Sequence, residues 1–204
     1  SRMNLNTIYG RGLYRATKAK VDKGIKGIFW FQGESDSDFG YEDNFNKLYN
    51  AWKEDYPNAK KVYVYQIRPG CPGPNHSALR EVQRNFQKKY PDIKTLATSG
   101  IDGFDGCHYY HRGYINIANN SFLQVERDFY GSTDSLNITS PNVERAFYSS
   151  PDHDEIKIIY SQKNDEFKYP NKFPYTGKMY SIEDYFYLDG KSGNIKFGKF
   201  NKDT

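Results

Sequence analysis

The chain has 204 residues, which is enough for one large domain or for a medium domain with a small one. Its formal net charge is +4 with scattered lysines, so no basic stripe indicates nucleic-acid binding, and no apolar run approaches the roughly 20 residues of a membrane span. Aromatic residues make up 17% of the chain, which is typical of tightly packed Tyr-rich strands and also of surfaces that stack on sugar rings.

Helical and strand-like patterns alternate through the first two thirds of the chain. Apolar residues at helical spacing predict helices over residues 6–19, 41–56, 77–90 and 113–129. Short apolar runs between turn residues predict strands over residues 27–32, 62–67 and 93–98. This alternation predicts an α/β fold with a mostly parallel sheet, in which ligands bind beyond the carboxyl ends of the strands.

The pattern changes after Gly131. Residues 132–139 form a polar linker, and short alternating runs such as 156–160 follow it, separated by Pro, Asn and Gly turns. We therefore predict two parts, an α/β catalytic part over residues 1–131 and a β-rich accessory region over residues 132–204. The accessory region could bind glycan through its tyrosines or simply pack on the catalytic layer.

A Gly-rich loop after the third predicted strand carries Asp105 and His108, three residues apart. An aspartate at this spacing can orient an imidazole and stabilise the imidazolium that forms during acyl transfer, so the pair would be two thirds of a serine-hydrolase triad. His111 could replace His108 as the base. The two histidines are also spaced for a metal ion, which leaves a metal-dependent hydrolase as an alternative.

The first predicted strand also ends in polar groups, in the sequence Gln32-Gly33-Glu34. The amide of Gln32 is a donor of the kind that stabilises a developing oxyanion. Glu34 could orient the imidazole or a substrate hydroxyl. From the residues alone, both side chains could equally cap the segment that follows.

Taken together, these blocks resemble a known family. In chain order they are Lys26-Gly27-Ile28-Phe29-Trp30-Phe31-Gln32-Gly33-Glu34-Ser35-Asp36, then Tyr41, Phe45 and Trp52, then Arg80-Glu81-Val82-Gln83, and finally Asp105-Gly106-Cys107-His108-Tyr109. The set resembles the sialate O-acetylesterase-like (SASA) family, which is related to the acetyl xylan esterases of carbohydrate esterase family six within the SGNH/GDSL hydrolase superfamily. The resemblance covers about residues 6 to 129.

The resemblance implies a three-layer α/β/α fold and a serine esterase that removes acetyl groups from sugars, with no cofactor or metal. By this resemblance Asp105 and His108 are the acid and base of the triad, and Gln32 is the oxyanion-hole side chain. Further side chains are expected to support the site, namely Glu34, Arg80 and Gln83. The alternative is a non-catalytic carbohydrate-binding module that keeps the fold.

The family's nucleophilic serine follows the first strand in a Gly-Asp-Ser or similar block, and a second block supplies an oxyanion glycine. Neither block is found in this chain, and neither Ser35 nor Ser99 occupies the family's nucleophile position. We therefore expect this chain to be the C-terminal part of a longer polypeptide whose upstream segment docks on strand 27–32. The 204 residues alone are expected to be inactive and poorly soluble.

The two cysteines, Cys71 and Cys107, both lie in Gly-rich turns that follow apolar strands. Because such turns share one edge of a parallel sheet, a disulfide between them is plausible, although two free thiols remain the alternative. A disulfide fits an oxidising compartment, so with the family resemblance it predicts a secreted, periplasmic or lumenal protein. The expected partner is an acetylated carbohydrate.

Overall fold

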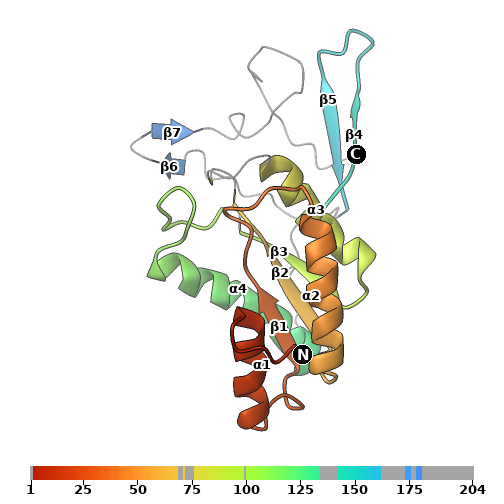
Figure 1. Cartoon of the computed structure of the whole chain (residues 1–204). Helices are drawn as coiled ribbons and strands as arrows, with labels where there is room; N and C mark the ends of the chain where they lie inside the picture. The colour runs from red at the N-terminus through yellow and green to blue at the C-terminus, as the bar shows by residue number, and fades with distance from the viewer. Residues whose placement is uncertain are drawn as a thin grey trace. The chain divides into compact units, whose positions relative to one another are not determined.

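A computed structural model describes residues 2–68, 71, 76–98, 100–133, 142–161, 173–175 and 178–180 of the protein (Figure 1). The chain divides into two compact units, Ser1–Ala118 and Asn119–Thr204, and the border lies within a helix. The domain border that the sequence suggests after residue 131 stays a prediction. No helix of the described part is both long and apolar enough to cross a membrane.

Helices and strands alternate in the first unit. Their order is α1 (Ile8–Lys18), β1 (Gly27–Trp30), α2 (Tyr41–Asp55), β2 (Lys61–Gln66), α3 (His76–Lys89), β3 (Ile93–Ala97) and α4 (His111–Phe129), which continues into the second unit. The three strands pair in parallel in the order β1-β2-β3, which confirms the predicted α/β fold. The first strand ends at Trp30, two residues earlier than predicted, so Phe31 and Gln32 already belong to the loop that leaves the sheet.

The ends of the helices follow from local chemistry. Thr7 caps α1, because its side chain accepts a hydrogen bond from the backbone N–H of Gly10. Gly40 precedes α2 in the left-handed conformation, with φ at 69°. The acidic residues Glu42 and Asp43 in the first turn interact favourably with the helix dipole. Pro57 follows the end of α2 and prevents the helix from continuing.

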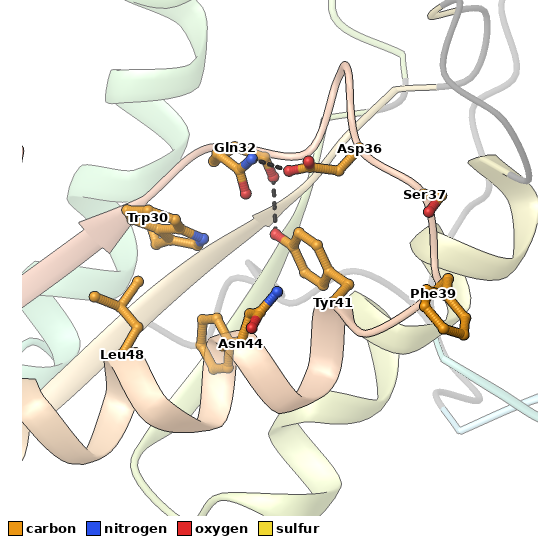
Figure 2. Close-up of a pocket in the computed structure, with 9 residues that line it drawn as sticks. Trp30, Gln32, Asp36, Ser37, Phe39, Tyr41, Asn44 and Leu48 are labelled. Carbon is orange, nitrogen blue, oxygen red and sulfur yellow. Dashed lines mark hydrogen bonds between the residues drawn. The ribbon is translucent and has the colours of Figure 1, made fainter.

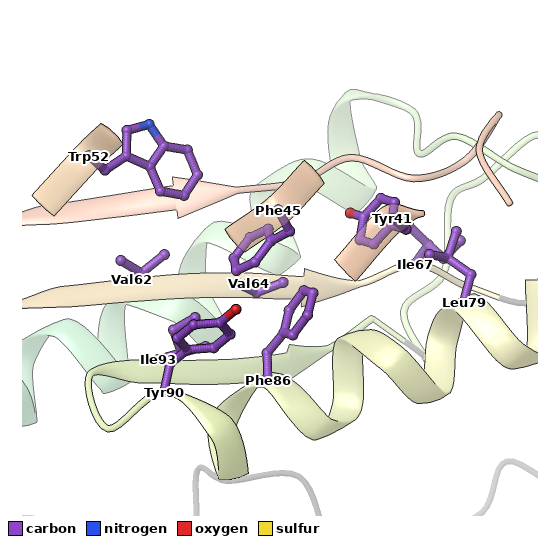
Figure 3. Close-up of a cluster of buried hydrophobic side chains, with 10 residues drawn as sticks. All are labelled: Tyr41, Phe45, Trp52, Val62, Val64, Ile67, Leu79, Phe86, Tyr90 and Ile93. Atoms are coloured by element: carbon purple, nitrogen blue, oxygen red, sulfur yellow. The ribbon is translucent and has the colours of Figure 1, made fainter. Parts of the chain in front are cut away.

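The larger hydrophobic core of the first unit packs α2 and α3 on one face of the sheet (Figure 3). Phe45 of α2 stacks on Phe86 of α3 with ring centroids 4.1 Å apart, and both side chains are almost fully buried. The complete cluster contains Tyr41, Phe45, Trp52, Val62, Val64, Ile67, Leu79, Phe86, Tyr90 and Ile93. These contacts hold the strands and the two helices together, and so they position the loops at the carboxyl edge of the sheet.

Side chains alternate between the two faces of a strand, so every second residue points to the opposite face of the sheet. This opposite face is aromatic. Tyr65 of β2 lies in a second cluster with Tyr109 and with Ile117 of α4. Phe31 packs beside this cluster, with its ring centroid 5.1 Å from that of Tyr65. The first turns of α4 therefore cover this face, and the first unit has the predicted arrangement of a sheet between two helical layers.

The described strands of the second unit form two antiparallel pairs. β4 (Val143–Tyr148) pairs with β5 (Ile156–Tyr160), and β6 (Phe173–Tyr175) pairs with β7 (Lys178–Tyr180). β5 is the strand that the sequence predicts over residues 156–160. Most of the remainder of the predicted β-rich region lies outside the described residues.

We predict that Phe86→Ala lowers the free energy of unfolding by about 3–5 kcal/mol, because it leaves a cavity beneath the Phe45 ring. Chemical denaturation monitored by circular dichroism measures this loss. Ile8→Ala is the control, because Ile8 is 82% exposed on α1 and its truncation leaves no cavity. Equal losses for the two variants would show that the α2–α3 packing contributes little to stability.

Candidate active site

The loop between β3 and α4 brings Asp105 and His108 together. An antiparallel bridge between Phe104 and Tyr109 closes this loop. One carboxylate oxygen of Asp105, Oδ1, accepts hydrogen bonds from the backbone N–H groups of Cys107 (2.9 Å) and His108 (2.8 Å). The other oxygen, Oδ2, lies 3.9 Å from Nδ1 of His108, and both side chains are exposed. Asp105 thus shapes the turn with one oxygen and faces the imidazole with the other.

The backbone N–H groups of Cys107 and His108 also lower the pKa of Asp105 below that of a free aspartate. The carboxylate therefore stays ionised at neutral pH and into the acidic range. Because the pKa is lower in the folded state, the ionised carboxylate stabilises the turn at any pH above the usual aspartate pKa. This stabilisation is lost as the pH falls through the lowered pKa.

A disulfide and a buried arginine connect this loop to the segment that follows β2. Cys71 forms a disulfide with Cys107, with the two Cα atoms 4.4 Å apart, which confirms the predicted bond. The buried side chain of Arg68 donates to the carbonyl of Gly106 (2.6 Å), and its guanidinium lies 3.3 Å from the centre of the Phe104 ring. No local pattern distinguishes Arg68 from other arginines, so the sequence does not predict its role.

The loop after β1 is held by Gln83, whose side chain is completely buried. Its amide nitrogen donates to the carbonyl of Gln32 (2.9 Å) and to the hydroxyl of Tyr41 (3.2 Å), and its amide oxygen accepts the backbone N–H of Ile67 (2.9 Å). The side chain of Gln32 in turn donates to the carboxylate of Asp36 (Figure 2). Gln83 thus joins the ends of β1 and β2, and Asp36 orients the candidate oxyanion donor.

Gly33 makes this arrangement possible. Its φ of 133° is one that other residues rarely adopt. A Cβ atom at this position would lie 2.9 Å from the amide nitrogen of Gln83, and that side chain has no room to move because it is buried. The glycine of the Gln-Gly-Glu sequence is therefore required both by the backbone turn and by the close approach of Gln83.

The two other expected supporting residues lie in different surroundings. Arg80 of α3 donates to the carbonyl of Ile67 (2.8 Å), and its pKa is lowered first by burial and then by the nearby charge of Arg68. Glu34 is half-buried in the loop after β1, and among the described residues no hydrogen bond joins it to the Asp105–His108 loop. Arg80 therefore connects α3 to the end of β2 through this hydrogen bond.

His111, the alternative base, is the first residue of α4 and is exposed. It lies in a helix, whereas His108 lies in the turn that Asp105 organises. Within the described ranges no group of three or more His, Cys, Asp and Glu side chains lies close enough to hold a metal ion.

A comparison with protein families identifies the class of this protein. The model of a family described as carbohydrate esterase, sialic acid-specific acetylesterase (SASA), matches residues 2–124. This match covers more than half of the chain, so the chain belongs to the SASA family of carbohydrate esterases. The matched range includes the loop after β1, the loop between β3 and α4, and the supporting residues Arg80 and Gln83 of α3. Searches among curated proteins and among solved structures found no matching relative.

We predict that a thiol titration of the unfolded, unreduced protein finds no free cysteine. Replacing both Cys71 and Cys107 by alanine should lower the free energy of unfolding by about 2–4 kcal/mol, because the bond restricts the unfolded chain. Wild-type protein under reducing conditions is the matched control and should lose a similar amount. Two titratable thiols in the unreduced protein would contradict the bond.

Proposed function

We propose that this protein is an acetylesterase that removes acetyl groups from sugars by serine-esterase chemistry. The pairing of Asp105 with His108 in one tight turn, in a chain of a carbohydrate esterase family, carries the proposal. His108 takes the proton of the attacking serine hydroxyl and returns it to the sugar oxygen that leaves. The carboxylate of Asp105 orients the imidazole and stabilises the imidazolium.

Gln32 supplies an oxyanion donor in this mechanism. A side-chain amide carries two N–H groups, and Asp36 accepts one of them. The other N–H can donate to the oxygen that becomes negative in the tetrahedral intermediate. The hydrogen bonds of Gln83 and Tyr41 to the Gln32 carbonyl hold its backbone in place, so the donor needs little rearrangement when charge develops.

We assign the attacking hydroxyl to a serine outside the described residues. Ser35 is exposed in the loop after β1, and neither Ser35 nor Ser99, which lies outside the described residues, occupies the family's nucleophile position. β1 is an edge strand of the described sheet, and an edge strand can pair with a further segment, which supports a serine-bearing segment beside it. The disulfide supports an oxidising compartment, and hence a secreted, periplasmic or lumenal location.

We predict that His108→Ala in the complete protein lowers kcat on a chromogenic acetyl ester by roughly 10³-fold or more, because the reaction loses its base. Stability should hardly change, since the His108 side chain is 58% exposed. His111→Ala is the matched control and should stay near wild type. If His111→Ala abolishes turnover while His108→Ala does not, the base is misassigned. If neither variant changes a measurable turnover, the esterase site lies elsewhere.

Asp105 can be tested separately as a charge and as a turn former. Asp105→Asn keeps an oxygen that accepts the backbone N–H groups of Cys107 and His108, but it removes the charge that faces the imidazole. We predict that this variant loses less stability than Asp105→Ala, because only the charge of the acceptor is removed, and loses roughly 10²-fold or more in kcat. Asp105→Ala should lose both activity and stability. An Asp105→Asn enzyme with full activity would show that Asp105 serves the turn alone.

A further inference from the structure

The turn that carries His108 is a small unit with its own backbone hydrogen bonds. The N–H of Asp105 donates to the carbonyl of His108 (2.9 Å), and the N–H of Tyr110 donates to the carbonyl of Gly103 (2.7 Å). The side chains of Asp105 and His108 are both exposed, so their own packing does not fix them against the sheet. The direction of the imidazole therefore depends on the groups that hold the turn from outside.

Tyr109, the residue after His108, connects the turn to the ends of two strands. Its side chain is buried, and its hydroxyl donates to the backbone carbonyl of Thr98, the first residue beyond β3. The side chain of Thr98 is also buried, and its hydroxyl donates to the carbonyl of Gln66, the last residue of β2 (2.8 Å). One chain of hydrogen bonds thus runs from the turn to β3 and on to β2.

Arg68 contacts the same turn at its tip and on both sides. Its buried guanidinium lies over the Phe104 ring on one side and donates to the carbonyl of Gly106 at the tip. On the other side, burial raises the pKa of Tyr109, and the nearby positive charge of Arg68 offsets part of that rise. Because a planar guanidinium presents five N–H donors in a fixed fork, one side chain can hold several points of the turn at once.

The disulfide does not fix the turn completely. It links the turn to the segment after β2 at one residue, Cys107, and a unit that is held at one point can still pivot about it. A general base must lie within about 2.6–3.2 Å of the group whose proton it takes, and a misplacement of about 1 Å can cost roughly 10²-fold in rate. The contacts of Tyr109 and Arg68 supply the further fixed points that such accuracy requires.

We propose that Tyr109 and Arg68 are positioning residues, which fix the turn against the sheet and thereby place the imidazole of His108 for proton transfer. The proposal rests on the proposed function only for the role of His108 as the base. Both side chains are buried and act through the turn, so their loss should lower kcat and leave KM unchanged.

Removing the hydroxyl of Tyr109 tests the first of these contacts. Tyr109→Phe keeps the buried ring, so kcat of the complete protein on a chromogenic acetyl ester should fall about ten- to a hundredfold while KM stays unchanged. Tyr49→Phe is the matched control, because it removes a tyrosyl hydrogen bond to Asp92, which precedes β3 at the opposite edge of the sheet. This control should keep the kcat of wild type. Full kcat in Tyr109→Phe, or an equal loss in both variants, overturns the proposal.

Arg68 can be tested by chemical rescue. Arg68→Ala should lose at least as much kcat as Tyr109→Phe, because it removes the contacts at the tip and on both sides of the turn. Guanidinium chloride, at concentrations below those that unfold the protein, should restore part of this activity by entering the space that the side chain leaves. Sodium chloride at the same ionic strength should not restore it, and guanidinium should not rescue Tyr109→Phe. A rescue of Arg68→Ala that sodium chloride matches overturns the role of Arg68.

Arg68→Lys gives a second test that does not depend on the folding of Arg68→Ala. It keeps a positive charge at this position but lacks the planar fork, so it should also lose about ten- to a hundredfold in kcat with KM unchanged. Full kcat in Arg68→Lys overturns the role of Arg68 in positioning.

Amide hydrogen exchange measures the turn itself, without any assay of activity. In Tyr109→Phe and Arg68→Lys, the N–H groups of Asp105 and Tyr110 should exchange about tenfold faster than in wild type, while that of Val64 in β2 should not change. Unchanged exchange at the turn overturns the proposal, and so does faster exchange with full kcat. If the complete protein hydrolyses no ester, the proposed function fails, while the exchange rates still decide whether these two side chains hold the turn.

Discussion

The buried amide of Gln83 is the interaction on which the candidate site depends most. The backbone hydrogen bonds of a parallel sheet end where its strands end, so the groups beyond β1 and β2 need other partners. Gln83 supplies them for the carbonyl of Gln32 and the N–H of Ile67, and a third bond reaches the hydroxyl of Tyr41. Since a buried amide is stable only when its donors and acceptor are satisfied, this side chain fixes α3, the end of β2 and the loop after β1 in one arrangement.

The two strand-end loops reach their positions by different means. The loop after β1 is held from inside, by Gln83 and by the close approach of Gly33. The loop that carries His108 is anchored by the buried Tyr109, and polar and covalent contacts hold the exposed turn itself. The disulfide and the Arg68 hydrogen bond act at Cys107 and Gly106, next to the proposed base. A disulfide and a hydrogen bond to the backbone restrict an exposed loop without covering the side chains that a substrate must reach.

The sequence by itself determined the features that depend on neighbouring residues or on strand ends. Helical spacing and short apolar runs predicted the α/β order, because periodicity reflects which face of an element is buried. The turn of Asp105 and His108 is local, and the pairing of Cys71 with Cys107 follows from loops at one sheet edge. Only the tertiary structure decided how Arg68 and Gln83 hold the two loops. Their partners lie far away along the chain or on a different element, and such contacts arise from packing, which leaves no periodic or short-range pattern in the sequence.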